Sequence, residues 1–185
     1  MALTSFTAIC QLRPEVPAGD ARALIAELPV GTHSPFHAGH RTHFGRIQVL
    51  DELATDQRRP LARPVLVVSC DIDGDAPSYL REIVAAAPDA FATILGCCAG
   101  GPSDAASPGF AADAVAFLTG HAIPIGLQFA TSPDRTVQEV RRAVDLHLRL
   151  AMFALDHQDS PPAALRAAFM AAFPPSAAHA PGSAL

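Results

Sequence analysis

The chain has 185 residues, half of them apolar, and a formal net charge of -5. This length and apolar content suit one globular domain with a hydrophobic core and exclude an intrinsically disordered chain. A net negative charge without an arginine cluster argues against nucleic-acid binding, and no apolar run reaches the roughly 18 residues of a membrane span. The N-terminus has no basic region before an apolar stretch, so we expect a cytoplasmic protein.

Strands are predicted where β-branched and aromatic residues cluster, and helices where apolar residues recur every three or four positions. Asp20 and Asp75 are expected to cap two of the helices. The charged segment 51–63 is expected to be a connection. In chain order, we expect strand 5–12, helix 20–28, strand 42–50, strand 64–72, helix 75–87, strand 91–98, helix 110–119, strand 123–130, helix 135–156 and helix 163–173.

The first six of these elements follow the order β-α-β-β-α-β, which is the ferredoxin-like order. Such a sheet carries helices on one face, so its other face must be covered. If a second copy covers it, the two sheets enclose a cavity, and the chain is a homodimeric α+β barrel. We therefore predict one ferredoxin-like α+β domain over residues 1–173, with an extra C-terminal strand and helices. The Pro/Ala-rich residues 174–185 are predicted to be disordered.

The predicted second strand contains the main candidate site. Strand alternation places Phe44, Arg46 and Gln48 on one face, and this set is too polar for a helix-packed core. We therefore expect it to face the cavity and bind substrate, with Gln128 joining from the strand over 123–130. Arg46 can bind a carboxylate, a phenolate or a haem propionate through paired hydrogen bonds. The alternative is an ion pair of Arg46 across the dimer interface.

Histidines are concentrated before and at the start of the same strand. His43, or a histidine of the preceding loop, is the candidate for moving protons because only histidine titrates near neutral pH without tuning. The loop histidines His33, His37 and His40 are a second candidate site, for a metal ion. The alternative for this loop is a solvated polar segment.

His147 lies among apolar residues of the predicted long helix. It is a candidate axial ligand to haem iron, since a helix-borne histidine commonly fills that role; the alternative is a core or interface histidine. The four cysteines are expected to be reduced and buried, although Cys97 and Cys98 would also suit a reactive pair at a strand end.

Five short segments carry a resemblance to a known family. They are Ser5–Ile9, Thr42–Arg46, Asp71–Gly74, Gly96–Pro102 and Thr136–Arg141. Together they resemble bacterial peroxidase-related proteins of the dimeric α+β barrel superfamily, which also includes dye-decolourising haem peroxidases and cofactor-free monooxygenases. Those peroxidases carry a Gly-x-x-Asp-Gly motif whose aspartate assists peroxide cleavage. The resemblance implies this role for Asp73, although Cys70 stands where the motif has its first glycine.

These observations predict an oxidative or isomerising enzyme that acts on an apolar or aromatic small molecule in a barrel cavity. Arg46 would orient an anionic group, His43 and Asp73 would be catalytic, and haem would be the cofactor if the enzyme has one. The first alternative is a non-catalytic ligand-binding or accessory module that dimerises through its open sheet face. The second is a metal-binding protein that uses the histidine loop, residues 33–43.

Overall fold

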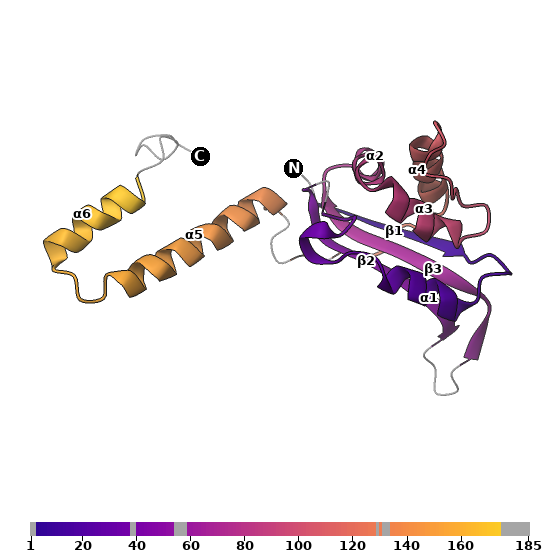
Figure 1. Ribbon diagram of the computed structural model, residues 1–185, viewed down its shortest axis with the longest axis horizontal. Helices are drawn as coiled ribbons and strands as arrows, with labels where there is room; N and C mark the ends of the chain where they lie inside the picture. Colours follow the sequence, from indigo (N-terminus) through magenta and orange to yellow (C-terminus); the bar gives the residue numbers. More distant parts are fainter. Residues whose placement is uncertain (1–2, 38–39, 54–58, 129, 131–133, 175–185) are drawn as a thin grey trace. The chain divides into compact units, whose positions relative to one another are not determined.

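The computed structural model describes residues 3–37, 40–53, 59–128, 130 and 134–174. Within these residues the chain is an α+β protein with one three-stranded antiparallel sheet and six α-helices (Figure 1). Its contacts divide it into two compact units, residues 1–139 and 140–185, which we describe separately. The single domain predicted over 1–173 stays a prediction, and the predicted tail lies, after Pro174, outside the described residues.

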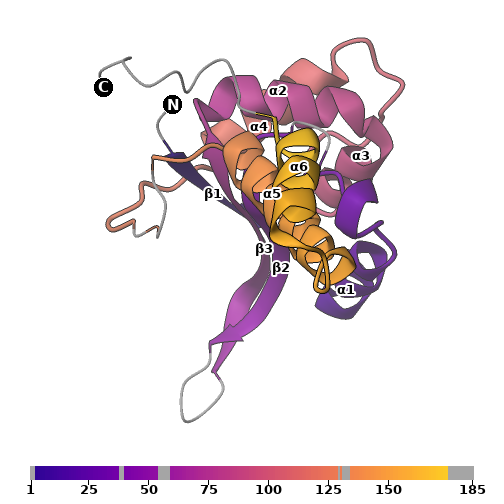
Figure 2. The same cartoon turned by 90° about the vertical axis from the view of Figure 1, so that its left-hand side faces the viewer.

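The sheet of the first unit has the strand order β1-β3-β2. Its strands are β1 (Leu3–Gln11), β2 (Thr42–Leu53) and β3 (Arg59–Asp73). The strands β2 and β3 extend into the segment predicted to be a connection and form a two-stranded arm beyond the helices (Figure 2). The central strand β3 is antiparallel to both neighbours, with Cys70 opposite Phe6 on one side and Gly45 on the other.

Helices cover one face of this sheet. They are α1 (Ala18–Ala26), α2 (Ala76–Ala86), α3 (Pro88–Gly96) and α4 (Phe110–Gly120). The even-numbered residues of β1 and β3 face these helices because side chains alternate along a strand. The core that results includes Phe6, Leu66, Ile72, Tyr79, Phe91 and Leu118.

The helix α2 begins as the sequence predicted. Gly74, with a φ of 86°, makes the turn out of β3. The Asp75 carboxylate then accepts the backbone N–H of Ser78 at 2.8 Å and caps the helix. The hydrogen bonds that Asp75 receives from Ser78 lower the pKa of its carboxyl group.

The strand predicted over 91–98 is wrong, because these residues belong to α3 and the turn after it. The β-branched and cysteine content of this segment suggested a strand. Its buried residues, however, recur at helical spacing, with Phe91, Ile94 and Leu95 all inside the core. Pro88 is at the start of the helix, where a backbone N–H would have no partner within the helix, so proline is tolerated there.

The strand predicted over 123–130 is also absent from the described residues of that segment. Residues 121–123, where the predicted strand would begin, instead contact the outer edge of β1. His121 accepts the N–H of Ile9 at 3.1 Å, and Ile123 donates to the carbonyl of Thr7 at 2.9 Å, on either side of a bridge between Ala8 and Ala122.

The second unit contains most of α5 (Val137–Asp156) and all of α6 (Pro162–Ala172). Both helices confirm the predicted elements to within two residues. No helix in the described part of the chain combines the length and the apolar character needed to cross a bilayer.

Candidate functional site

A histidine–aspartate pair lies at one end of the sheet. Nε2 of His43 is 2.9 Å from Oδ1 of Asp73, and the side chains of His43 and Asp73 are 22% and 7% exposed. Asp73 is the last residue of β3, and His43 is the second residue of β2. The structure therefore brings together two of the three residues predicted to be catalytic.

A β-bulge aims His43 at Asp73. Along the β2–β3 pairing, Thr42 lies opposite Ile72 and Phe44 lies opposite Asp71, so that one extra residue, His43, stands between them. Such a bulge turns a side chain out of the strict alternation of a strand and is frequent beside active sites. The sequence contains no local signal for it.

The second oxygen of the Asp73 carboxylate holds the start of α5. Oδ2 accepts the backbone N–H of Val137 at 2.8 Å, and Val137 is buried. Thr136 and Glu139 complete this helix start as a capping box, since the Glu139 carboxylate accepts the Thr136 N–H at 2.8 Å and the Thr136 hydroxyl accepts the Glu139 N–H at 3.2 Å. Asp73 is therefore fixed from both sides.

These contacts determine which nitrogen of His43 carries the proton. An ionised carboxylate accepts hydrogen bonds and donates none. Because Asp73 accepts at Nε2, the neutral imidazole of His43 holds its proton there and has a free lone pair at Nδ1. A buried aspartate bonded to one ring nitrogen of a histidine is an arrangement that orients the imidazole for general-base catalysis.

Arg41 fixes the strand ends that carry the pair. Its guanidinium donates to the backbone carbonyl of Asp73 at 3.3 Å and to the Ser78 hydroxyl at 3.1 Å, and it forms an ion pair with Glu82 at 3.0 Å. Its own carbonyl accepts the N–H of Asp73 at 2.9 Å. Arg41 is therefore occupied in holding the site and is not the arginine that would meet a ligand.

Arg46, the third predicted catalytic residue, lies on the sheet face that the helices leave open. Its guanidinium carbon is 5.8 Å from the centre of the Phe44 ring. Among the described residues no hydrogen bond or ion pair of Arg46 is found beside this ring contact. Gln48 shares this face, opposite Val67 in the register.

The open face is polar at the end near His43 and aliphatic at the other end. Near His43, the Ser5 hydroxyl donates to Asp71, and the hydroxyls of Thr7 and Ser69 are 3.0 Å apart. The far end is formed by Ile9, Leu50, Val65 and Val67. Ile9, Phe44 and Leu50 remain 38–52% exposed, so the described residues do not cover the margins of this face.

A shallow groove of about 150 Å³ runs beside β2 on its helix side. The residues that line it include Ile25, Leu28, Phe36, Gly45 and Arg46. The Phe36 ring packs directly on Gly45, where an added Cβ would approach the ring carbon Cγ to 2.6 Å. The groove is too small for a substrate of ordinary size, and the glycine is explained by packing.

The other predicted site residues are not brought to this site by the described structure. Gln128 is exposed and lies outside any strand. His37 and His40 are neighbours, with ring centroids 5.3 Å apart. Among the described residues no group of three side chains that could hold a metal ion is found.

The cysteines are buried and none is activated as a nucleophile by a cation. Burial raises the pKa of Cys97, and burial with the neighbouring Asp71 raises the pKa of Cys70 to about 12. The Sγ of Cys97 donates back to the carbonyl of Thr93, one turn earlier in α3. These groups fit the prediction of small buried side chains.

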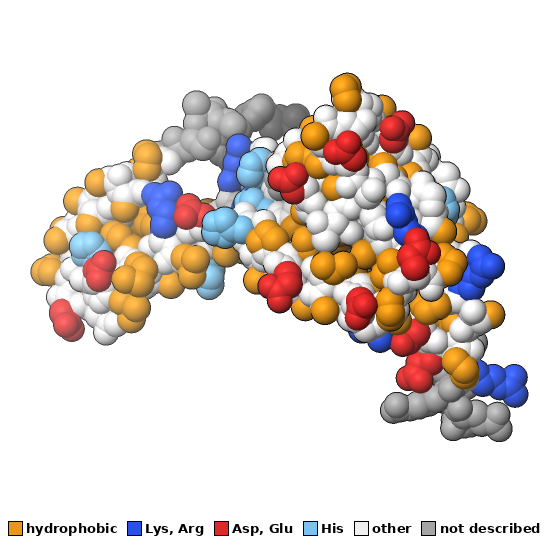
Figure 3. Space-filling model, turned by 45° about the vertical axis from the view of Figure 1, so that its right-hand side comes forward, with side chains coloured by type: hydrophobic (Ala, Val, Ile, Leu, Met, Phe, Trp, Pro, Cys, Tyr) orange, Lys and Arg blue, Asp and Glu red, His pale blue; other side chains and the backbone are white. Residues whose placement is uncertain are grey.

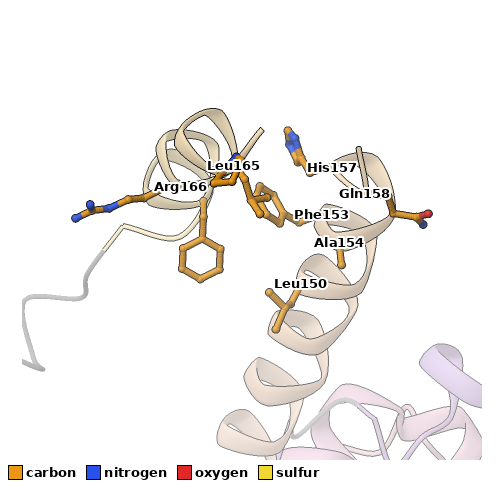
Figure 4. Close-up of a pocket in the computed structure, with 9 residues that line it drawn as sticks. Leu150, Phe153, Ala154, His157, Gln158, Leu165 and Arg166 are labelled. Atoms are coloured by element: carbon orange, nitrogen blue, oxygen red, sulfur yellow. The ribbon is translucent and has the colours of Figure 1, made fainter. Parts of the chain in front are cut away.

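The second unit has a groove that the sequence did not predict. It measures about 580 Å³ and lies between α5 and α6 (Figure 4). Its lining is mostly apolar, and the labelled polar side chains Arg166 and Gln158 point away from it. His157 lines the groove, packed on Phe153 at 4.3 Å, whereas His147 is exposed on α5 and does not line it.

No family model, no curated protein and no solved structure matches this chain. The geometry of the site therefore carries the functional argument.

Proposed function

We propose that the chain is a small-molecule enzyme in which His43 removes a proton from a substrate that Arg46 holds by an anionic group. The observation that carries this proposal is the His43–Asp73 contact, with the second Asp73 oxygen taken by the Val137 N–H. Nδ1 of His43 accepts the proton, and the Asp73 carboxylate stabilises the imidazolium that forms.

The expected substrate is an aromatic or otherwise apolar carboxylate or phenolate. Arg46 supplies a bidentate donor without an anionic partner in the described residues, and the Phe44 ring beside it supplies an apolar surface. After the proton transfer, return of the proton to a second carbon isomerises the substrate. Reaction of the substrate anion with dioxygen or peroxide as co-substrate gives the oxidative outcome that the family resemblance implies.

A ferredoxin-like dimeric barrel is part of the same proposal. The strand order β1-β3-β2 leaves the fourth position of that fold at the outer edge of β1, and the segment around Ala122 bridges to this edge. A second copy seated on the open face would close the flat site into a cavity and exclude water from it.

No step of this reaction is assigned to haem. The predicted ligand His147 is exposed on α5 and has no described groove beside it, so it does not fit an axial ligand buried among apolar residues. Haemin titration, followed through the Soret band of the wild type and of His147→Ala, tests this assignment independently.

The test of the proposed function has two stages. Ligand-observed NMR should detect binding of aromatic carboxylates such as phenylacetate in preference to the matched alcohols. Arg46→Gln should remove that preference, whereas Arg22→Gln should keep it, because Arg22 lies on α1 and is engaged in an ion pair with Asp51. Bound acids should then exchange their acidic C–H for deuterium from D2O, and His43→Gln should abolish the exchange. Binding of acids and alcohols alike, or exchange that survives in His43→Gln, would contradict the proposal.

The second candidate is a non-catalytic module that dimerises through the open face. The exposed apolar side chains Ile9, Phe44 and Leu50 on that face favour it. In that case the protein binds no acid from the panel, and Ile9→Glu makes it monomeric. The metal-binding alternative, with the loop histidines as ligands, is tested by metal analysis of the purified protein.

A further inference from the structure

Two of the buried cysteines meet in the core of the first unit, although they are far apart in the sequence. Cys10 is near the end of β1, and Cys98 follows the end of α3. The thiol of Cys98 forms a hydrogen bond with the sulfur of Cys10, and both residues are completely buried. The sequence suggested Cys97 and Cys98 as a reactive pair, whereas the structure gives Cys98 a partner on the sheet.

The backbone holds Cys98 against the end of β1. Cys98 forms an antiparallel bridge with Leu12, and the backbone hydrogen bonds on either side of this bridge measure 2.9 Å. The Arg13 side chain adds two more bonds, to the carbonyls of Cys98 and Gly101, both at 3.0 Å. Cys10 comes two residues before Leu12, so strand alternation places both side chains on the helix-covered face. The contact between the two sulfurs is therefore fixed by backbone pairing.

The other two cysteines do not share this contact. The Sγ of Cys97 donates to a backbone carbonyl of α3 at 3.4 Å. A disulfide between Cys97 and Cys98 would also close a strained small ring, because the two residues are adjacent in the chain. The sulfur of Cys70, on β3, is hydrogen-bonded to Tyr79. Among the four cysteines, all of which the structure describes, hydrogen bonding joins only Cys10 and Cys98.

The hydrogen bond gives the two sulfurs different roles. The Cys98 thiol donates to the Cys10 thiolate and so lowers the pKa of Cys10, although burial opposes this effect. The same hydrogen bond, together with burial, raises the pKa of Cys98, which therefore keeps its proton. The thiolate is the form of cysteine that reacts with oxidants. Cys10 is therefore the sulfur that reacts first, and Cys98 is the thiol that resolves the product.

We propose that Cys10 and Cys98 are a redox pair, which hydrogen peroxide converts to a disulfide. The Cys10 thiolate attacks one peroxide oxygen, and the O–O bond breaks. Cys10 becomes a sulfenic acid, and the hydroxide that leaves takes up the Cys10 proton as the first water. The Cys98 sulfur then attacks the sulfur of Cys10, so that the S–S bond forms and the S–O bond breaks. The hydroxyl group leaves with the Cys98 proton as the second water.

This reaction balances without a further reagent. The two thiols lose two electrons and two protons, and one peroxide molecule is reduced to two molecules of water. Both sulfurs lie beneath the surface of the first unit, one face of which Figure 3 shows, so a small uncharged oxidant is the kind that can reach them. The inference does not depend on the proposed reaction at His43, because both sulfurs belong to the core on the helix-covered face.

The disulfide should stabilise the first unit. It would join β1 to the end of α3 and enclose the chain between residues 10 and 98. A cross-link that closes a long loop restricts the unfolded chain strongly. Oxidation should therefore raise the urea midpoint by about 2 M, and reduction with dithiothreitol should reverse this rise.

Peptide mapping of the native full chain after peroxide treatment tests the pairing. The protein is unfolded, its remaining thiols are blocked with N-ethylmaleimide, and it is cut with trypsin, which cleaves after arginine except before proline. A disulfide between Cys10 and Cys98 should join residues 1–22 to residues 82–135, and dithiothreitol should separate them. Four blocked thiols after a treatment that oxidises glutathione would overturn the proposal, as would oxidation of Cys10 to a sulfinic acid without a link.

Matched replacements identify the partner, because residues 82–135 also contain Cys97. Cys97→Ala should still give the joined peptides and the higher urea midpoint, whereas Cys98→Ala should give neither. Fragmentation of the joined wild-type peptides between residues 97 and 98 locates the link without any replacement. A link that persists in Cys98→Ala, or that fragmentation places on Cys97, would overturn the proposal.

Discussion

Replacing Asp73 by asparagine or by alanine should separate the structural role of this carboxylate from its chemical role. The backbone N–H of Val137 can only donate, so an asparagine must turn its amide oxygen toward Val137. Its NH2 group then faces Nε2 of His43, which must become the acceptor. The ring proton moves to Nδ1, and His43 loses the lone pair with which it is proposed to act.

The two variants differ in stability by an amount that follows from the same contacts. Asp73→Asn keeps both hydrogen bonds in weaker, uncharged form, and we expect a loss of about 1 kcal/mol. Asp73→Ala leaves the buried Val137 N–H without an acceptor and removes two charge-assisted bonds, for an expected loss of about 3 kcal/mol. At a urea m-value of roughly 1.5 kcal/mol/M, the midpoints should fall by about 0.7 M and about 2 M respectively.

Two measurements check this reasoning. The single tyrosine, Tyr79, is fully buried in the first unit and the chain has no tryptophan, so tyrosine fluorescence reports the unfolding of that unit. Long-range 1H–15N NMR spectra identify the tautomer of His43. The control is Asp71→Asn, which changes a neighbouring carboxylate bonded to Ser5 and should leave the His43 tautomer as it is. A proton that stays on Nε2 in Asp73→Asn, or equal destabilisation by both replacements, would refute the assignment.

Three further predictions concern the core behind the site. In urea titrations Thr42→Val should destabilise the first unit by about 2 kcal/mol, because it leaves the buried Tyr79 hydroxyl without its Thr42 partner. Tyr79→Phe should cost only about 1 kcal/mol, because Thr42 in that variant still donates to the Phe36 carbonyl. Equal losses of stability in the two variants would contradict this. Gly45→Ala should lower the melting temperature, since its Cβ would overlap the Phe36 ring, and Gly45→Ala combined with Phe36→Leu should recover part of the loss. With a pKa of about 12 in the fold against 9.0 for the free thiol, Cys70 should stay unreactive toward iodoacetamide at pH 9 in the native protein. The stability that the neutral Cys70 thiol contributes to the fold is complete below pH 9 and is lost as the pH rises from 9 to 12. Urea unfolding midpoints measured across that pH range can follow this loss.

Local patterns in the sequence were sufficient for much of the fold. The alternation in β1 and β2, the apolar run in β3 and the Asp75 cap each depend on residues close together in the chain, and the structure confirms them. The prediction of a strand over 91–98 failed because β-branched and cysteine residues are common in any buried element, and a short apolar run does not distinguish a strand from a helix. The burial of Phe91, Ile94 and Leu95 against neighbouring helices decided its conformation.

In the candidate site, too, local patterns were predictable and contacts between distant residues were not. Strand alternation correctly separated Arg46 and Gln48 from the residues that face the helices. The contact between His43 and Asp73 could not be predicted in this way, because it depends on a register shift between two strands 30 residues apart. The hydrogen bond from Val137 to Asp73 is donated by a backbone N–H, so the type of residue at position 137 does not predict it.

The carboxylate of Asp73 couples the charge of His43 to the start of α5, because it bonds to both His43 and the backbone of Val137. Protonation of His43 or removal of its proton by a ligand changes the charge that one Asp73 oxygen faces, while the other oxygen holds the first N–H of α5. A neutralised Asp73 is a poorer acceptor for a helix N-terminus, where a negative charge is favoured. Amide hydrogen exchange at Val137 should therefore be faster in Asp73→Asn than in the wild type, and the Thr136–Glu139 capping box should keep the exchange at Val140 unchanged. Equal acceleration at both amides would mean that the whole first turn of α5 depends on Asp73, and unchanged exchange at Val137 would mean that the hydrogen bond does not hold the helix start.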